Sequence, residues 1–151
     1  MTEADRRRAA IGDLEGAFSS LIADFRAMYA QMASTVSPGM LPGTYKVLST
    51  IDRRGPVSAS WLAEHLALDK GQMSRHISEL EDLGLVSRSV DPSDGRIRVI
   101  SVTEEGATRL AAARAPYESR LSDRLATWPV ESIEQLVELL GALRTDRDLA
   151  D

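Results

Sequence analysis

Residues 85–106 read LVSRSVDPSDGRIRVISVTEEG. Two short runs that alternate apolar and polar side chains flank the charged loop DPSDGR, a pattern typical of an antiparallel β-hairpin. Thr103, which follows the second run, is a candidate N-cap for a helix. Asp94 and Arg96 stand at the tip of the hairpin, where nothing can bury them. The tip is therefore either a solvated turn or a projection that contacts another molecule.

Two short helices are predicted directly before the hairpin. Ser58 is a plausible N-cap for the first, over residues 59–68. Asp69 and Gln72 have the form of a capping box for the second, over residues 70–84. Two helices joined by such a short turn form a helix-turn-helix, and a hairpin that follows at once makes it a winged helix.

The second of these helices has an apolar face and a polar face. At 100° per residue, Met73, Ile77 and Leu80 fall together, which predicts that they are buried. The other face carries one guanidinium and short polar side chains that could contact base edges in a major groove. The candidate DNA-binding residues on it are Gln72, Ser74, Arg75 and Ser78. The alternative for each is a solvated helix surface or, near the helix start, a capping role.

Apolar residues also recur at helical spacing on both sides of the winged helix. A long helix is predicted over residues 11–32 and a shorter one over 44–54. A further helix should run over 103–128, kinked at Pro116, with another after it. These apolar stripes exceed what the core of a small winged helix needs. They favour dimerisation, and packing within the chain's own domain is the alternative.

The composition is that of a soluble globular protein with one domain, since 43% of the 151 residues are apolar and 27% are charged. There is no cysteine, which excludes disulfides, thiolate metal sites and sensing through thiol oxidation. We find no secretory signal and no stretch fit to span a bilayer. We therefore expect a cytoplasmic protein without a membrane partner.

The net charge of −5 is distributed unevenly along the chain. Residues 1–45 carry 4 basic and 5 acidic groups, residues 46–98 carry 8 and 8, and residues 99–151 carry 6 and 10. The acidity lies at the C-terminal end, and the middle is neutral. Net charge thus neither supports nor excludes a nucleic-acid partner, because what matters is which face holds the arginines.

With these elements in place, the chain resembles the MarR family of winged-helix regulators over roughly residues 11–145. The most specific part is the hairpin, where the family shows Asp-x-Arg, five residues, Leu-Thr, and often a glycine three residues further on. The matching residues here are Asp94, Arg96, Val102 in place of leucine, Thr103 and Gly106, preceded by Asp91 and Pro92. The stretch LEDLGLV, residues 80–86, looks like the family's usual exit from the second helix of the helix-turn-helix.

The resemblance implies a mainly α fold with a small antiparallel β-hairpin as a wing. The architecture would be a winged helix-turn-helix plus N- and C-terminal dimerisation helices, in one MarR-like domain over residues 1–151. Within that domain, residues 44–103 would form the DNA-binding region. Residues 11–33 and 104–145 would form the dimerisation helices.

The resemblance also implies a function: a sequence-specific regulator of transcription that binds double-stranded DNA, with repression as the expected action. A homodimer would bind a pseudopalindromic operator, and a small aromatic or phenolic effector would release it. Arg96 would enter the minor groove, and Asp94 would help to hold it, often by pairing with another arginine. Arg98 could touch a phosphate or pair within the sheet.

Nothing in the sequence points to catalysis, a cofactor or a metal site, so we do not expect an enzyme. His65 and His76 lie too far apart, without convergent cysteines or carboxylates, to indicate a metal site. Four residues could line an effector pocket but are equally explained by core packing: Tyr29, Met32, Met40 and Trp61. The competing function is a winged-helix module that binds a protein partner and no DNA.

Overall fold

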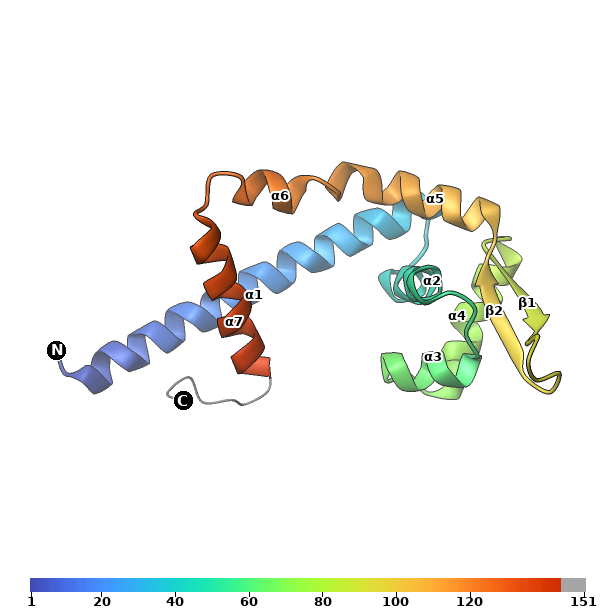
Figure 1. The fold of residues 1–151 in the computed structure, drawn as a ribbon, viewed down its shortest axis with the longest axis horizontal. Helices are drawn as coiled ribbons and strands as arrows, with labels where there is room; N and C mark the ends of the chain where they lie inside the picture. The colour runs from blue at the N-terminus through green and yellow to red at the C-terminus, as the bar shows by residue number, and fades with distance from the viewer. Residues whose placement is uncertain (145–151) are drawn as a thin grey trace. The chain divides into compact units, whose positions relative to one another are not determined.

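The computed structural model describes residues 1–144 and contains two compact units, Met1–Arg114 and a second that begins at Ala115. The elements of the first unit are α1 (Glu3–Val36), α2 (Pro42–Arg54), α3 (Ala59–Leu66), α4 (Lys70–Asp82), β1 (Val86–Val90), β2 (Arg98–Val102) and α5 (Glu104–Arg114) (Figure 1). The second unit contains the 3₁₀ turn η1 (Ala115–Tyr117), α6 (Arg120–Leu125) and α7 (Val130–Arg144). The predicted fold class, mainly α with an antiparallel hairpin as a wing, is confirmed.

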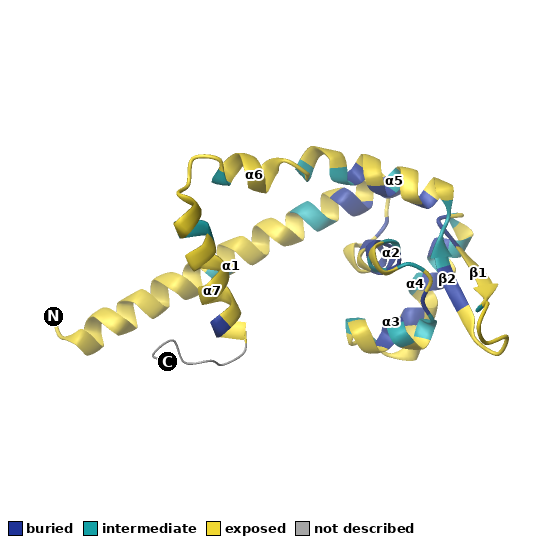
Figure 2. Cartoon of the chain, viewed as in Figure 1, coloured by how far each residue is buried: buried dark blue, intermediate teal, exposed yellow. Residues whose placement is uncertain are grey.

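The winged helix is built around a core to which α2, α3, α4 and the hairpin contribute. Figure 2 shows the buried residues where these elements meet. The predicted apolar face of α4 is confirmed, because Met73, Ile77 and Leu80 are all fully or almost fully buried. Leu48 of α2 and Leu62 of α3 are likewise inaccessible to solvent. Burial of side chains of this size, at about 1.5–3 kcal/mol each, is what holds the short helices together.

The two helices of the helix-turn-helix begin at the predicted residues. The hydroxyl of Ser58 accepts a hydrogen bond from the backbone N–H of Trp61 at 3.2 Å. The carboxylate of Asp69 accepts one from the backbone N–H of Gln72 at 2.8 Å. The return bond from the Gln72 side chain is not among the hydrogen bonds of the described residues. Asp69 is therefore a simple N-cap, and the expected capping box is only half formed.

A glycine turn ends α4 and sends the chain directly into the hairpin. Gly84 has φ of 70°, a left-handed conformation that most side chains disfavour. Its N–H bonds to the carbonyl of Glu81 at 2.9 Å, and the N–H of Leu85 bonds to the carbonyl of Leu80 at 2.9 Å. These two bonds satisfy carbonyls that the end of a helix would otherwise leave unpaired.

The hairpin pairs β1 with β2 in antiparallel register, with Val86 opposite Val102 and Val90 opposite Arg98. Val57, before α3, adds a short bridge to β2. Its backbone exchanges two hydrogen bonds with Ile100, at 3.1 and 2.8 Å. The middle of β2 is thereby joined to the segment that precedes α3. This contact supports the wing, because a two-stranded hairpin alone is only marginally stable in water.

Two helices begin earlier than the sequence predicts. α1 begins at Glu3 rather than at residue 11, because Thr2 and Asp5 form a capping box with bonds of 3.2 and 3.0 Å. Apolar periodicity could not indicate this start, since the first turns of α1 are polar and exposed. α2 begins at Pro42, two residues before the predicted start, with proline in the first turn where its missing N–H costs nothing.

The prediction of one kinked helix over residues 103–128 is wrong. α5 ends at Arg114, a 3₁₀ turn containing Pro116 follows, and α6 begins at Arg120. A proline lacks the backbone donor and crowds the preceding turn, and here these effects end the helix instead of bending it. The C-terminal helix predicted after Trp128 is present as α7, which ends at Arg144, and residue 145 of the predicted dimerisation region lies outside the described residues.

Candidate nucleic-acid interface

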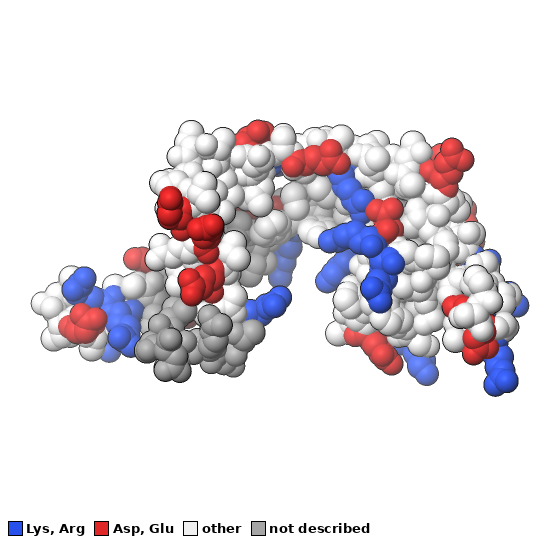
Figure 3. Space-filling view, in the orientation of Figure 1, with Lys and Arg blue, Asp and Glu red and all other residues white. Residues whose placement is uncertain are grey.

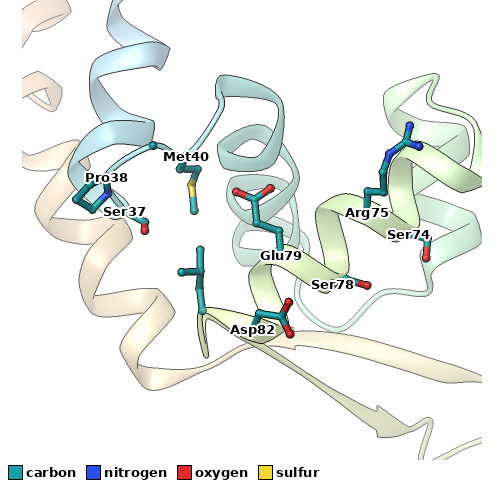
Figure 4. A pocket seen from close by; sticks show the side chains of 10 residues that line it. Ser37, Pro38, Met40, Ser74, Arg75, Ser78, Glu79 and Asp82 are labelled. Atoms are coloured by element: carbon teal, nitrogen blue, oxygen red, sulfur yellow. The ribbon is translucent and has the colours of Figure 1, made fainter.

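The four candidate residues of α4, Gln72, Ser74, Arg75 and Ser78, are all exposed. In Figure 4, Ser74 and Arg75 leave the helix in different directions, and Ser78 follows one turn later. Because Met73 and Ile77 are buried on the opposite side, the candidates lie on the surface that α4 would present to a groove of DNA.

A buried hydroxyl ties this helix to α2. Thr44 is inaccessible to solvent, and its hydroxyl donates to Oε2 of Glu79 at 2.8 Å. The hydroxyl oxygen of Thr44 also lies 2.9 Å from Nδ1 of His76. Because a hydroxyl has a single proton, Nδ1 of His76 is the donor in this second bond. Glu79 is therefore held toward α2, as Figure 4 also shows, instead of facing outward.

An ion pair ties the other end of α4 to the wing. The guanidinium of Arg88, on β1, donates to both carboxylate oxygens of Glu81, at 2.8 and 2.9 Å. Glu79 and Glu81 thus both have partners. The carboxylate of Glu81 is thus paired with a guanidinium, that of Glu79 is directed toward α2, and Asp82 is exposed.

Two carboxylates organise the tip of the wing. Oδ1 of Asp91 accepts hydrogen bonds from the backbone N–H and the hydroxyl of Ser93, at 2.7 and 2.5 Å, and a longer one from the N–H of Asp94. Oδ1 of Asp94 accepts one from the backbone N–H of Arg96 at 3.0 Å. These are local side-chain-to-backbone turns, which fix a loop without any burial.

The way in which Asp94 supports Arg96 differs from what the resemblance implies. Among the described residues, Asp94 has no ion pair with an arginine, and its carboxylate acts on the backbone of Arg96 instead. Arg96 and Arg98 are both exposed, and neither side chain has an ion pair with a described residue. The Arg96 guanidinium is therefore presented to solvent from a loop that is already ordered.

The electrostatics of the tip follow from the Asp91 turn. The side-chain hydrogen bond from Ser93, reinforced by backbone bonds from Ser93 and Asp94, lowers the pKa of the Asp91 carboxyl below its usual value. Those bonds favour the ionised carboxylate, which is the stronger acceptor. The turn is therefore intact at neutral pH and weakens only in acid.

Contacts at the base of the wing account for the threonine and the glycine that follow it. The hydroxyl of Thr103 donates to the carbonyl of Gly84 at 2.7 Å and accepts from the N–H of Gly106 at 3.1 Å, which confirms Thr103 as the cap of α5. The N–H of Thr103 bonds to the carbonyl of Leu85 at 3.0 Å. A side chain at Gly106 would overlap that carbonyl oxygen and press on Val102. Only glycine lets α5 start this close to the end of α4.

An open groove of about 560 Å³ runs beside α4 (Figure 4). One wall is the connection between α1 and α2, and the other is the exposed side of α4. The lining residues are Ser37, Pro38, Gly39, Met40, Ser74, Arg75, Ser78, Glu79, Asp82 and Leu83. Hydroxyls, carboxylates and one guanidinium share the lining with Pro38, Met40 and Leu83, so the groove presents both polar and apolar surface.

Of the four residues considered for an effector pocket, Tyr29 and Met32 both contact Tyr45, and Met40 alone is among the residues that line the groove beside α4. Tyr29 packs edge-on against Tyr45, with ring centres 5.6 Å apart, and the Tyr45 hydroxyl lies 3.1 Å from the sulfur of Met32. Met40 lines the groove beside α4. Trp61 lies on α3, stacked on His65 at 4.5 Å. Packing accounts for Tyr29, Met32 and Trp61 without any ligand.

Three residues that shape this surface were not among the sequence candidates: Thr44, Arg88 and Asp91. The DPSD spacing could have indicated the role of Asp91, since an aspartate two or three residues before a backbone donor is a frequent turn. No local signal connects Thr44 with Glu79, or Arg88 with Glu81, because each pair forms only when separate elements pack.

At the end of the hairpin a basic side chain projects beside acidic ones (Figure 3). Among the residues that the structure describes, no three histidine, cysteine, aspartate or glutamate side chains are grouped to hold a metal ion. None of the described helices is long and apolar enough to cross a membrane.

Comparison with known proteins identifies the same region. The family model described as MarR family matches residues 39–97, which include α2, α3, α4 and β1. The chain is 31% identical over 115 residues to the uncharacterized HTH-type transcriptional regulator YxaD of Bacillus subtilis, covering 76% of this chain and 80% of that protein. It is 34% identical over 127 residues to the uncharacterized HTH-type transcriptional regulator Mb0904 of Mycobacterium bovis, covering 84% and 83%.

Solved structures share the fold across nearly the whole chain. The MarR family transcription regulator SP03579 superposes with a TM-score of 0.80 at 17% identity, covering 95% of this chain and 94% of that one. FabT of Streptococcus pneumoniae, solved in complex with DNA, superposes with a TM-score of 0.78 at 13% identity, covering 89% and 95%. Together with the sequence matches, this likeness shows that the chain belongs to the MarR family and is a transcriptional regulator.

Proposed function

We propose that this regulator acts as a homodimer that binds a pseudopalindromic double-stranded operator through α4 and the wing. The observation that carries the proposal is the wing tip. Two carboxylates order the loop by bonding its backbone, and this leaves the Arg96 guanidinium exposed with no ion-pair partner among the described residues. An ordered loop that projects a cation is suited to a narrow minor groove, where the negative potential is concentrated.

α4 supplies the major-groove contact in this proposal. Its N-terminal half carries Gln72, Ser74 and Arg75, and Ser78 lies one turn further on. A guanidinium can pair with guanine, and short polar side chains can reach base edges or phosphates. The groove beside α4 leaves room around Arg75 for contact with DNA. Arg98, exposed on β2, is placed to contact a phosphate. The structure of FabT in complex with DNA supports this use of the fold.

The exposed apolar stripe of α1 supports a homodimer. Five of its large side chains, between 46% and 51% exposed, recur at a spacing of three, four or seven residues: Ile11, Leu14, Leu21, Ile22 and Phe25. In α7, Val137, Leu140 and Leu143 are also exposed. Such stripes are unfavourable in water and mark surfaces that another chain covers. We assign residues 11–33 and 104–145 to dimerisation and residues 44–103 to DNA binding, within one domain over 1–151.

In a homodimer the two α4 helices would enter successive major grooves, with half-site centres about 34–36 Å apart. Repression would follow from occupation of the operator in the cytoplasm. Release by a small aromatic or phenolic effector would require only that the effector favour a dimer whose two α4 helices do not match this spacing.

The experiment that tests the proposal selects bound sequences from a random double-stranded library and measures the affinity of the selected duplex by fluorescence anisotropy. A scrambled duplex of equal composition is the control. We expect a pseudopalindromic sequence, a preference of about a thousandfold or more over the scrambled duplex, and an affinity that falls steeply with salt. Absence of binding to any duplex at low salt would refute the proposal and favour a winged-helix module with a protein partner.

A further inference from the structure

A half-buried polar cluster links α2 to α5 across 62 residues of sequence. Nη1 of Arg114, the last residue of α5, lies 2.6 Å from Oδ2 of Asp52. Nη2 of the same guanidinium donates to the hydroxyl of Ser49 at 3.0 Å. Ser49 and Asp52 are three residues apart on α2, so a single planar guanidinium spans one turn of that helix.

The environment of this cluster keeps the guanidinium charged. Partial burial of Arg114 opposes its charge, but the interactions with Asp52 and Tyr45 outweigh that effect and raise the pKa of the guanidinium. The two side chains of the ion pair are only 28% and 27% exposed, so water and salt screen the pair less than they screen a surface pair. Ser49, the second acceptor, is 2% exposed.

Little else ties α2 to α5. α5 and α2 both pack along α1, but they meet each other directly at few positions. Among the described residues, the side-chain hydrogen bonds and ion pairs between α2 and α5 all involve Arg114. The N-terminal end of α5 is fixed separately, by Thr103 and Gly106 against the turn at Gly84 and Leu85. α5 is thus attached to the winged helix at both of its ends.

We propose that Arg114 is a positioning residue, whose bonds to Asp52 and Ser49 set the direction of α2, and of the α4 helix packed on it, relative to α1 and α5. The inference rests on the proposed function and deepens it. In the homodimer, that direction decides how far apart the two α4 helices lie. Arg114 therefore determines which spacing of operator half-sites the protein accepts.

Physical chemistry favours a geometric role over a purely stabilising one. A half-buried ion pair adds little net stability compared with apolar side chains of similar volume, because desolvation offsets the attraction. Its directional bonds nevertheless define one orientation, whereas apolar contacts between two helices tolerate sliding. One base pair shifts a half-site by about 3.4 Å along the DNA, so small changes in direction are sufficient to change the preferred spacing.

The test measures affinity for duplexes in which the selected half-sites are moved together or apart by one and two base pairs. The protein variants are Arg114→Met, which preserves side-chain length without the charge, and Asp52→Asn. Arg53→Met is the matched control, because Arg53 also donates to the Ser49 hydroxyl, at 3.0 Å, but belongs to α2 itself. Among the described residues, its hydrogen bonds are all to Ser49, within the same helix. Each variant is first shown to be folded and of unchanged oligomeric state.

We expect the wild type and Arg53→Met to prefer the selected spacing by about tenfold or more over a two-base-pair displacement. For Arg114→Met and Asp52→Asn we expect the preference to fall below about threefold. Affinity for a duplex with a single half-site should stay unchanged, because α4 and the wing are untouched. A loss of stability alone would lower affinity for every spacing alike.

Wild-type spacing preference in folded Arg114→Met or Asp52→Asn would overturn the inference. So would failure of both variants to fold, because the pair would then be a requirement for folding and not a positioning device. Failure of the proposed function is distinguishable, since in that case the wild type itself would bind no duplex.

Discussion

The winged helix and the long terminal helices place their apolar residues in opposite ways. In the winged helix, the apolar face of α4 is buried and the polar face is exposed. In α1, the residues of the apolar stripe are about half exposed, between 46% and 51%: Ile11, Leu14, Leu21, Ile22 and Phe25. Both patterns have the same helical spacing in the sequence. Helical spacing therefore indicates which residues form an apolar face, but not whether the surface that covers this face belongs to the same chain.

The two regions should therefore contribute to two different quantities, the stability of the folded chain and the association of one chain with another. The core of the winged helix is closed by contacts within one chain, whereas we propose that a second copy of the chain covers the stripe of α1. A change in the first region should lower the stability of the chain, and a change in the second should lower its association. Changes at the exposed candidate residues of α4 and the wing should affect neither the stability nor the association.

The largest effect should come from the core of the winged helix. Leu80→Ala, at a fully buried position of α4, should lower the free energy of unfolding by about 2–5 kcal/mol, because it removes apolar contacts and leaves a cavity. Urea denaturation followed by circular dichroism, at one fixed protein concentration, measures this loss. Ser78→Ala, on the exposed side of the same helix, should change it by less than about 0.5 kcal/mol. Equal losses in the two variants would mean that α4 does not have one buried face.

The next effect should appear in the stripe of α1. Leu21→Glu introduces a charge into the surface that we assign to the homodimer, so the dimer should dissociate into folded monomers. Affinity for the complete operator should fall about a hundredfold or more, because each monomer can hold only one half-site. Sedimentation velocity measures the first effect and anisotropy the second. Ser20→Glu, exposed on the other side of α1, is the matched control. A Leu21→Glu protein that stays dimeric would remove the stripe from the interface.

A smaller effect is expected on the face of α4. Arg75→Ala should weaken operator binding by about 1–3 kcal/mol and relax the choice of base at one position, without a change in stability or dimerisation. Anisotropy with single-base variants of the operator measures both quantities. Arg7→Ala removes the same charge from an exposed position at the start of α1 and should have no such effect. If Arg75→Ala and Arg7→Ala weaken binding equally, Arg75 contributes only through its positive charge and makes no specific contact with a base.

The smallest effect concerns the order of the wing tip. The native pKa of Asp91 is lowered, so the stability that its bonds give the loop is present above the ordinary carboxyl pKa and is lost as the pH falls through the lowered value. The amide resonances of Ser93 and Asp94 should therefore be constant from pH 7 to about pH 5 and should shift only in more acidic solution. In Asp91→Ala the pH-dependent shift should vanish, and operator affinity at pH 7 should fall by less than about threefold. A shift of these amides centred above pH 5 would contradict the lowered pKa.

Much of the fold could be predicted because its signals are local. Caps at Ser58 and Thr103, the left-handed glycine at Gly84 and the alternation in the hairpin each depend on a few neighbouring residues. The start of α1 was not predicted, because its capping box lies in a polar segment outside the apolar period. The end of α5 was not predicted either, because the sequence shows that a proline disturbs a helix but not whether the helix bends or stops.

The exposure of the candidate residues could be predicted from the sequence, but the contacts around them could not. The residues of α4 and the wing are on the surface, as periodicity indicates for them. The bond from Thr44 to Glu79 and the link from Arg114 to Asp52 join positions 35 and 62 residues apart. No pattern within one element contains such pairs. They arise only when α2, α4 and α5 pack, and they are the contacts that fix the direction of α4.

The most direct test of the account combines a change in the wing with a change in the DNA beneath it. Affinities of the wild type and Arg96→Ala are measured on the selected operator and on a duplex whose flanking A·T pairs are replaced by G·C pairs. We expect the wild type to lose about 1–3 kcal/mol on the altered duplex, because the wider minor groove attracts a guanidinium less. Arg96→Ala should bind both duplexes alike, and about as weakly as the wild type binds the altered one. If folded Arg96→Ala binds the selected operator as tightly as the wild type does, the wing tip is only a turn and the account is wrong.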